Sequence, residues 1–274
     1  MTIALLGAGV MGEILLAGLL RSGRVPDELV ATDRRPARAE EIRHRYGVRV
    51  VENTEAVSGA DTVLLVVKPQ DVTDVLDEVR AALLPGALVV SLVAGVETEV
   101  IEQHLDAGAP VVRVMPNTPA AVGEGMAAIS AGSSATAEHL DRVTAILSSV
   151  GKVVTVPERY QNAVTAISGS GPAYLMFVVE AMIDAGVLLG LPRDIATQLV
   201  VQTMLGSAKL LSETGQHPTV LRENVTSPGG TTAAALRALE DHRVKAAFIT
   251  AMEAARDRGQ ALADQARAHG RSAH

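Results

Sequence analysis

The sequence predicts an α/β protein, with a doubly wound parallel sheet in the first half of the chain and an all-α domain in the second. Up to about residue 157, short apolar runs alternate with segments of helical periodicity, which is typical of parallel strands joined by helices. Beyond that point the strand pattern stops, and long segments rich in Ala, Leu, Val and Met follow. We therefore expect two domains, residues 1–157 and residues 158–274.

The expected elements follow one another in regular order. Strands are predicted near Ile3, Val30, Val48, Val63, Val89 and Val112, and helices near Ile14, Ala39, Val75 and Val100. Residues 126–130 and 152–156 flank a predicted helix at 137–148 and are expected to extend one edge of the sheet. In the second half, residues 160–213 and 219–268 are expected to be helical, with breaks at residues 190–192 and at a Pro-Gly-Gly turn. The tail from Ala268 is expected to fray.

The N-terminus joins a short apolar run to a helix through a glycine turn. Gly7, Gly9 and Gly12 have the GxGxxG spacing, and Asp33 closes the next predicted strand about twenty positions further on. In this pattern Gly7 permits the tight turn, Gly9 lets a pyrophosphate approach the backbone, and Gly12 lets the helix lie close to the strand. We interpret it as the nicotinamide or flavin dinucleotide site of a Rossmann-type domain. The alternative is a glycine turn used only for packing.

A second candidate follows the apolar run at residues 64–67, which ends in Lys68 and Pro69. Such a run is typical of a buried parallel strand, and ligands bind at the carboxyl ends of strands in open α/β sheets. Lys68 could therefore reach a phosphate or a substrate carboxylate. The alternative is an ordinary solvated lysine.

Two segments of the second half place small and hydroxyl residues at the start of a predicted helix. Residues 226–232 read Thr-Ser-Pro-Gly-Gly-Thr-Thr, and residues 168–174 read Ser-Gly-Ser-Gly-Pro-Ala-Tyr. Free backbone N–H groups and the positive end of the helix dipole can bind a carboxylate there without lysine or arginine. The alternatives are a plain helix cap after a tight turn, made by Thr231 or Thr232, and an interdomain hinge.

Four segments closely resemble the pyrroline-5-carboxylate reductase family: residues 114–119, 168–174, 189–192 and 226–240. The resemblance runs from the glycine turn to near residue 260. It implies NAD(P)H-dependent reduction of the cyclic imine 1-pyrroline-5-carboxylate to L-proline, the last step of proline biosynthesis. It also implies a Rossmann-type domain followed by an all-α dimerisation domain, and a homodimer that in some members assembles into a larger ring. The apolar residues on nearly all sides of segments 174–191 and 195–211 agree with a face covered by a second subunit.

Within that family we expect the substrate carboxylate to be held by amides and hydroxyl groups of both helix starts: Gly230, Thr231, Thr232, Ser168 and Ser170. Thr232 is the candidate catalytic residue, as a proton donor to the ring nitrogen. The resemblance adds Glu158 and Asn224 as neighbours of the substrate. The alternatives for these two are a surface carboxylate and a helix-ending residue.

The resemblance also implies the residues that contact the dinucleotide: Leu6, Gly7, Ala8, Gly9, Val10 and Met11; Asn53; Val66, Val67, Lys68 and Pro69; and Leu92, Val93 and Ala94. Gly12 joins them through the glycine spacing, and Asn53 could instead be a helix N-cap. A carboxylate at Asp33 would accept hydrogen bonds from a ribose diol and repel a 2′-phosphate, but Arg34 and Arg35 follow and could neutralise it or stack on the adenine. We expect NADPH as the cofactor, with NADH as the alternative.

Composition excludes several other classes. The net charge of −7 argues against nucleic acid as a partner. The absence of cysteine excludes disulfides, thiol nucleophiles and cysteine metal sites, and the seven histidines lack ligand spacing, so no metal site is expected. The chain enters its first strand without a charged leader, and no apolar stretch reaches bilayer length without interruption, since Glu180 and Asp184 interrupt segment 175–191. We expect a cytoplasmic protein that does not bind membranes.

Two other functions remain open. Another dehydrogenase of the same superfamily, such as a β-hydroxyacid dehydrogenase or an imine reductase of different substrate, should carry a catalytic lysine in the helix at 174–191, which has none. A non-catalytic dinucleotide sensor would keep the three glycines but would not need the two anion-binding helix starts.

Overall fold

The structure is a computed structural model that describes the backbone of residues 1–272 and the side chains of residues 1–265. By packing, the chain divides into two units. Unit 1 contains residues 1–170 and the chain from Ala255 onward, and unit 2 is Gly171–Ala254. The domain boundary expected between residues 157 and 158 therefore lies within unit 1. That the dimerisation domain begins at residue 158 stays a prediction.

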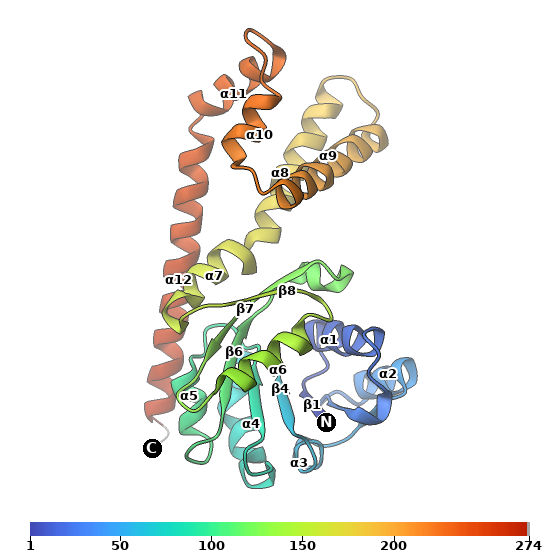
Figure 1. Ribbon diagram of the computed structural model, residues 1–274, viewed down its shortest axis with the longest axis vertical. Coiled ribbons are helices and arrows are strands. Elements are labelled where there is room, and N and C mark those ends of the chain that lie inside the picture. The colour runs from blue at the N-terminus through green and yellow to red at the C-terminus, as the bar shows by residue number, and fades with distance from the viewer. Residues whose placement is uncertain (273–274) are drawn as a thin grey trace. The chain divides into compact units, whose positions relative to one another are not determined.

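Unit 1 is built on an eight-stranded sheet in the order β3-β2-β1-β4-β5-β6-β7-β8 (Figure 1). Its strands are β1 Ile3–Leu6, β2 Leu29–Thr32, β3 Arg49–Val50, β4 Thr62–Leu65, β5 Leu88–Ser91, β6 Val111–Met115, β7 Gly125–Ala131 and β8 Gly151–Thr155. Neighbours are parallel except for the antiparallel pair β6–β7. The strand order reverses direction between β1 and β4, and this switch point is where doubly wound sheets bind ligands. The predicted doubly wound sheet is confirmed, with β7 and β8 extending one edge.

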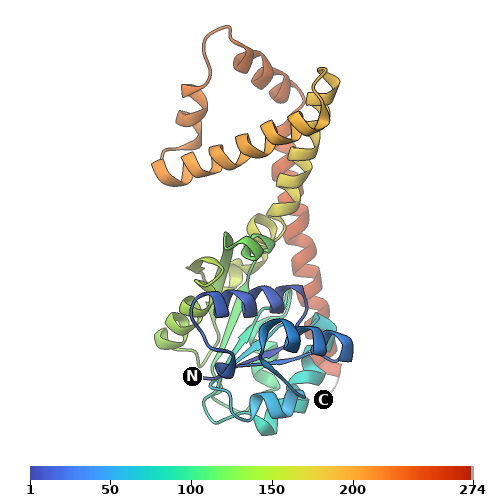
Figure 2. The same ribbon diagram turned by 90° about the vertical axis from the view of Figure 1, so that its right-hand side faces the viewer.

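Helices cover both faces of this sheet: α1 Val10–Arg21, α2 Pro36–Tyr46, α3 Asn53–Val57, α4 Val72–Val79, α5 Thr98–Gln103 and α6 Ala137–Leu147. Alternate residues of β1 enter two different cores. Ile3 and Leu5 pack with α1, α2 and α6, whereas Ala4 and Leu6 pack with α3, α4 and α5. Figure 2 shows α1 and α2, in blue, side by side on the same face of the sheet. Burial on both faces explains the unbroken apolar character of the strands.

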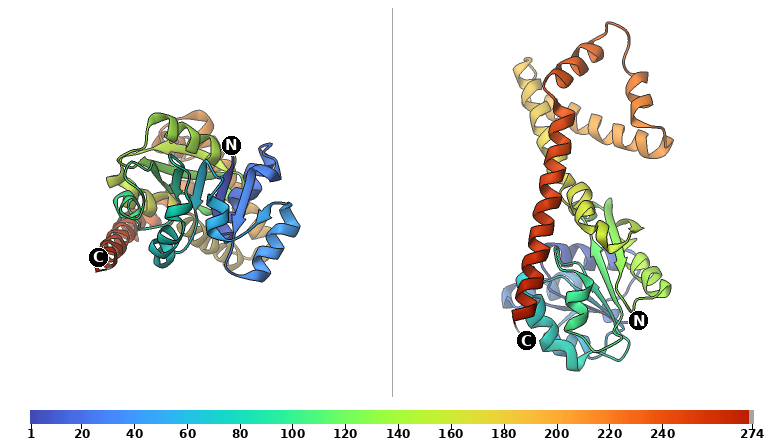
Figure 3. Two further views of the ribbon diagram at one scale, coloured as in Figure 1. Left: turned by 90° about the horizontal axis from the view of Figure 1, so that it is seen from below. Right: turned by 90° about the vertical axis from the view of Figure 1, so that its left-hand side faces the viewer.

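Two more helical segments, one from the middle and one from the end of the chain, also belong to unit 1. Helix α7, Gln161–Val164, lies against the sheet, where the Gln161 side chain donates hydrogen bonds to the Ser130 hydroxyl (2.8 Å) and to the Ala128 carbonyl (3.3 Å). Helix α12 is Val244–Ser272, and its last part lies against the same unit (Figure 3). One contact there is a hydrogen bond of 2.8 Å from Asn162 Nδ2 to Gln260 Oε1. The predicted fraying from Ala268 is not observed up to Ser272, and the final two residues lie outside those that the structure describes.

Unit 2 is all-α: α8 Gly171–Leu188, α9 Arg193–Thr214, α10 Pro218–Asn224, α11 Thr231–Asp241 and the first part of α12. The two predicted breaks are confirmed, with positive φ angles at Gly190 (96°) and Gly229 (68°). A further break separates α11 from α12 at Arg243, whose φ is 55°. The unbroken helix expected from the Pro-Gly-Gly turn to residue 268 is therefore wrong, because α11 and α12 are separate helices.

Apolar side chains cover much of the surface of α8 and α9. Helix α8 has no buried residue within the chain, and the side chains of Phe177 and Leu188 are 73% and 88% exposed. The helical stretch Glu158–Leu188 is long and apolar enough to cross a membrane by length and composition alone, contrary to the expectation from its acidic residues. One such helix is weak support for a membrane span, because apolar helices that are covered in a folded protein have the same length and composition.

Candidate functional site

The glycine turn between β1 and α1 has the geometry of a dinucleotide-binding loop. Gly7 has a φ of 101°, and a Cβ built there would lie 2.7 Å from the carbonyl oxygen of Val66. A Cβ built at Gly12 would overlap the carbonyl oxygen of Gly7. At Gly9, by contrast, no protein atom lies within 4 Å of a built Cβ. Packing therefore requires Gly7 and Gly12, whereas Gly9 leaves open space beside its backbone.

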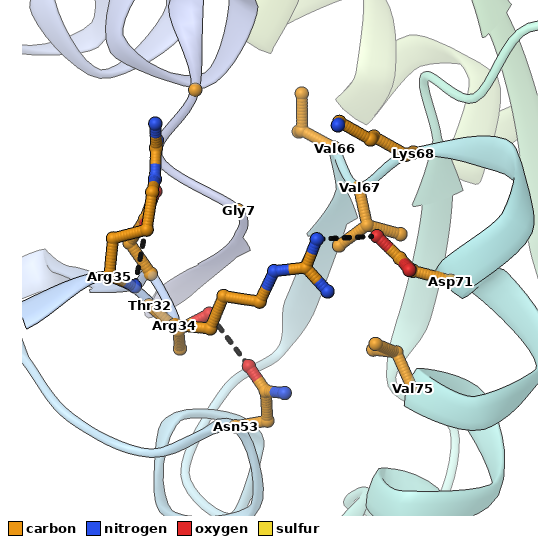
Figure 4. A pocket seen from close by; sticks show the side chains of 12 residues that line it. Gly7, Thr32, Arg34, Arg35, Asn53, Val66, Val67, Lys68, Asp71 and Val75 are labelled. Atoms are coloured by element: carbon orange, nitrogen blue, oxygen red, sulfur yellow. Dashed lines mark hydrogen bonds and ion pairs between the residues drawn. The ribbon is translucent and has the colours of Figure 1, made fainter. Parts of the chain in front are cut away.

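A cavity of about 330 Å³ adjoins this turn, at the carboxyl ends of β1, β2 and β4 (Figure 4). It is lined by Gly7, Gly9, Thr32, Asp33, Arg34, Arg35, Asn53, Val66, Val67, Lys68, Asp71 and Val75. Most of these were predicted cofactor residues, but Thr32, Asp71 and Val75 were not. Other predicted cofactor residues are not among the lining: Leu6, Ala8, Val10, Met11, Gly12, Pro69, Leu92, Val93 and Ala94. Of these, Leu6, Ala8, Leu92 and Val93 have buried side chains, so only their backbone groups could meet a ligand.

The Asp33 carboxylate accepts three hydrogen bonds from the residue two positions later. Arg35 donates to it from Nε (2.9 Å), from Nη2 (3.0 Å) and from its backbone N–H (2.9 Å). Burial raises the pKa of Asp33, but the hydrogen bonds and charge of Arg35 outweigh burial and hold that pKa below its ordinary value. A ribose diol would therefore compete with Arg35 for this carboxylate.

Arg34 reaches the cavity from the loop after β2, and Asn53 reaches it from the start of α3. Arg34 extends across it to Asp71, with 3.3 Å between Nη2 and Oδ2, and its side chain is 73% exposed (Figure 4). Asn53 accepts the Thr32 hydroxyl at 2.7 Å and donates to Glu78 at 2.9 Å. The N-cap of α3 is Glu52, so the alternative assignment of Asn53 as a helix cap is wrong.

Glu158 belongs to a polar cluster inside unit 1. Its carboxylate accepts the Thr98 N–H at 2.8 Å, the Thr98 hydroxyl at 2.5 Å and Arg113 Nη1 at 3.2 Å. The Arg113 side chain is 4% exposed and that of Glu158 is 26% exposed. The alternative of a plain surface carboxylate is therefore wrong. Arg113 was missed from the sequence, although a lone charge within the apolar strand Val111–Met115 is a recognisable signal.

Ser168 and Ser170 lie in a continuous helical passage and not at an open helix start. Helix α7 continues through a π-helical turn, Thr165–Gly169, before α8 begins at Gly171. The Ser170 N–H donates to the Thr165 carbonyl at 2.8 Å, and the Ser168 hydroxyl donates to Val164 at 3.2 Å. The expected free amide at Ser170 is thus wrong, because the π-type hydrogen bond uses it. π-helical turns are nevertheless frequent at functional sites.

The start of α11 in unit 2 is open at Thr231 and Thr232, but the expected free amide at Gly230 is wrong because its N–H is already used. Gly230 is the N-cap, its N–H donates to Ser227 at 3.0 Å, and no side chain caps the helix. Thr231 and Thr232 are the first two helical residues, so neither is the predicted cap. The first N–H groups of a helix have no partner within it. An anion could therefore bind here.

The predicted substrate residues are divided between the two units. Unit 1 carries Glu158, Ser168 and Ser170, and unit 2 carries Asn224, Gly230, Thr231 and Thr232. Asn224 is the last residue of α10, as its alternative assignment stated. Its contribution to a substrate site stays a prediction, as do those of the other six.

Comparisons with known proteins agree with this architecture. The family model for pyrroline-5-carboxylate reductase dimerisation matches residues 158–262, and that for coenzyme F420-dependent NADP oxidoreductases matches residues 2–95. The pyrroline-5-carboxylate reductase of Corynebacterium melassecola is 44% identical over 265 residues, covering 95% of this chain and 98% of that protein.

Solved structures give the same result. The structure of a pyrroline-5-carboxylate reductase from Coxiella burnetii is 35% identical with a TM-score of 0.90, covering 95% of this chain and 98% of that one. The Plasmodium falciparum pyrroline carboxylate reductase, solved with NADP bound, is 30% identical with a TM-score of 0.86, covering 96% and 98%. Similarity over almost the whole length of both chains, at these identities, shows that this protein belongs to the pyrroline-5-carboxylate reductase family of oxidoreductases.

Proposed function

We propose that this protein reduces 1-pyrroline-5-carboxylate to L-proline with NADPH, in the last step of proline biosynthesis. The observation that carries the proposal is the open backbone at Gly9, between two glycines that packing requires, beside a cavity at the switch point of the sheet. Membership of the family gives the substrate class. In the net reaction the imine carbon gains a hydride and the nitrogen gains a proton.

The glycine turn and the cavity would hold the cofactor, which supplies the hydride when bound. Gly9 and the start of α1 would face the pyrophosphate. Arg34 would face the 2′-phosphate, because its guanidinium extends over the cavity and is mostly exposed. NADPH is favoured over NADH because Arg35 pairs with the Asp33 carboxylate, so that a free 2′-hydroxyl would have to compete for this acceptor. The relative that was solved with NADP bound supports this choice.

The amides and hydroxyl groups of Thr231 and Thr232 would bind the substrate carboxylate. The Ser170 hydroxyl would be a further donor, and the Ser168 hydroxyl would become one by exchanging its bond to the Val164 carbonyl for one to the substrate. Thr232 would donate to the ring nitrogen, which must carry a proton before the imine carbon accepts a hydride. Glu158 and Asn224 would border the substrate. Holding two rings in reacting distance is the larger part of such catalysis, because little covalent chemistry is left to the protein.

We also propose that the protein is a cytoplasmic homodimer, possessing no nucleic-acid or membrane partner, and that dimers assemble further into a ring. The dimerisation domain would begin at residue 158, where the family model begins. The exposed apolar faces of α8 and α9 support this, because a second copy would cover them. Sedimentation of the purified protein would measure the size of the assembly. A monomer that is stable at micromolar concentration would contradict the proposal.

The activity is tested by adding 1-pyrroline-5-carboxylate and following the loss of dihydronicotinamide absorbance. A β-hydroxyacid dehydrogenase would instead oxidise a hydroxyacid with NADP⁺, and a sensor would bind NADPH without oxidising it. Thr232→Ala should lower kcat. Thr226→Ala is a matched control from the same loop, since the Thr226 hydroxyl donates to the Arg222 carbonyl at 2.6 Å. Unchanged kcat and KM in Thr232→Ala would reject the proposed role of Thr232.

A further inference from the structure

Arg38 connects helix α2 to the glycine turn. Its Nε donates to the carbonyl oxygen of Ala8 at 2.9 Å, across 30 residues of sequence. Its Nη1 donates to Glu41 at 2.7 Å, and its Nη2 donates to Glu13 at the start of α1. All three nitrogens of the guanidinium are therefore engaged, and the side chain is 15% exposed. Arg38 does not line the cavity.

The Ala8 carbonyl belongs to the peptide that precedes Gly9. Ala8 itself is 0% exposed, and the N–H groups of Gly7 and Ala8 both donate to the Thr32 carbonyl, at 3.2 and 2.9 Å. These bonds fix the turn up to the Ala8 amide, but they do not fix the peptide between Ala8 and Gly9. In a planar trans peptide the C=O and N–H groups point in opposite directions. The bond from Arg38 to the Ala8 oxygen thus directs the Gly9 N–H away from Arg38.

We propose that Arg38 is a positioning residue for the dinucleotide, acting through the Ala8 carbonyl to aim the Gly9 N–H at the pyrophosphate. The inference rests on the proposed use of NADPH. Arg38 makes no contact with the cofactor in this proposal, and its effect is carried by one backbone group. A peptide held in its binding orientation before the ligand arrives loses less conformational freedom on binding.

The acidic partners of Arg38 hold its side chain in place. Glu13 accepts from Arg38, from Arg45 at 2.5 Å and from the Tyr46 hydroxyl at 2.8 Å. Burial raises the pKa of Glu13, but the hydrogen bonds from Arg38 and Tyr46 and the charge of Arg38 outweigh it, so this pKa lies below its ordinary value. Glu13 is therefore ionised near neutral pH, and it fixes Arg38 between α1 and α2.

The test compares two arginines of the same helix. Arg43 also donates to a backbone carbonyl, that of Val50 at 3.0 Å, and also pairs with a glutamate, Glu40, but neither partner belongs to the glycine turn. The full-length variants Arg38→Met and Arg43→Met are titrated calorimetrically with NADPH and with adenosine 2′-phosphate. The second ligand shares the adenine, ribose and 2′-phosphate but has no pyrophosphate.

Arg38→Met should raise the Kd for NADPH by about tenfold or more, as expected if the Gly9 N–H no longer donates its hydrogen bond to the charged pyrophosphate. Its Kd for adenosine 2′-phosphate should stay within about twofold of the wild-type value, and Arg43→Met should leave both values within the same range. A general loss of structure would instead weaken both ligands. Equal weakening of both, an unchanged Kd for NADPH in Arg38→Met, or the same effect in Arg43→Met would overturn the inference.

Two further comparisons keep the test decisive. Arg38→Lys retains the charge beside Glu13 but has a carbon, Cε, at the position of the Nε that donates to the Ala8 carbonyl, so it lacks that donor. If Arg38→Met does not fold, Arg38→Lys decides the matter, and a wild-type Kd for NADPH in that variant would reject the role of Arg38. A wild-type protein that does not bind NADPH would instead reject the proposed function. The two failures are thus distinguishable.

Discussion

Replacing Gly9 by alanine is expected to weaken NADPH binding without destabilising the fold. A Cβ built at Gly9 has no protein atom within 4 Å, and the backbone there, with φ −66° and ψ −166°, is open to any residue. A Cβ built at Gly12 overlaps the carbonyl oxygen of Gly7, which is a backbone atom and cannot move aside cheaply. Two glycines of the same motif should therefore respond differently to the same substitution.

The expected magnitudes separate binding from stability. Gly9→Ala should leave the free energy of unfolding unchanged or raise it by about 0.4–1 kcal/mol, because alanine restricts the unfolded chain. If the methyl group takes the space of a pyrophosphate oxygen, the overlap costs about 1–3 kcal/mol, which raises the Kd for NADPH by roughly 5- to 150-fold. Gly12→Ala should lower the free energy of unfolding by about 2 kcal/mol, since backbone overlap outweighs the roughly 1 kcal/mol gained in helix propensity.

Urea unfolding and calorimetric titration with NADPH measure the two effects. Gly59→Ala is a matched control, because a Cβ at Gly59 also meets no atom within 4 Å and the residue does not line the cavity. It should leave the Kd for NADPH unchanged, and it should change the free energy of unfolding only as Gly9→Ala does, by at most about 1 kcal/mol. Wild-type affinity for NADPH in Gly9→Ala would refute the assignment of Gly9 to the pyrophosphate. A loss of stability equal to that of Gly12→Ala would refute the packing argument.

Other expected outcomes concern charged groups. Arg35→Met frees the Asp33 carboxylate for a ribose diol, so the ratio of kcat/KM for NADPH to that for NADH should fall by about tenfold. Steady-state kinetics with both cofactors would measure this ratio, and an unchanged ratio would contradict the role of Arg35. The pKa of Glu13 lies below its ordinary value of 4.5, so the stability that Glu13 contributes is present above that pH and is lost as the pH falls through its folded-state pKa. Glu13→Gln should therefore flatten the acid side of a plot of Tm against pH, and a curve parallel to that of the wild type would reject the argument. Arg113→Met leaves Glu158 without its buried cation and should lower the free energy of unfolding by about 1–3 kcal/mol. A urea midpoint equal to that of the wild type would contradict this expectation.

The sheet and its glycine turn were predictable because their signals are local. Both faces of β1 are packed, by Ile3 and Leu5 on one side and by Ala4 and Leu6 on the other, so a parallel strand in this position must be apolar throughout. The glycine spacing is equally local, because the turn, the close approach and the open backbone concern residues within one short loop. A pattern of this kind needs no knowledge of the rest of the fold.

Helix boundaries in the second half were less predictable. Arg243 separates α11 from α12 with a positive φ, although neither glycine nor proline marks the position. The reverse error occurred before α8, where glycine and proline predicted an open helix start but the chain passes through in a π-helical turn. In this turn Gly169 packs closely against β6, since a Cβ built at Gly169 would lie 2.5 Å from the Cε of Met115. Whether a helix continues past such residues depends on what it packs against, which the local sequence does not contain.

The partners of Arg38, which is partly buried, and of Arg113, which is buried, lie furthest from any sequence pattern. Arg38 looks like one of several solvated charges in a helix of mixed charge, yet it reaches Ala8 across 30 residues. Arg113 is a recognisable anomaly within an apolar strand, but its partner Glu158 lies 45 residues away. An unpaired charge in such positions would be too costly to keep, so each arginine must find an acceptor that only the fold can supply. Both acceptors are predicted functional residues, and this is the physical reason to test the two arginines as parts of the site.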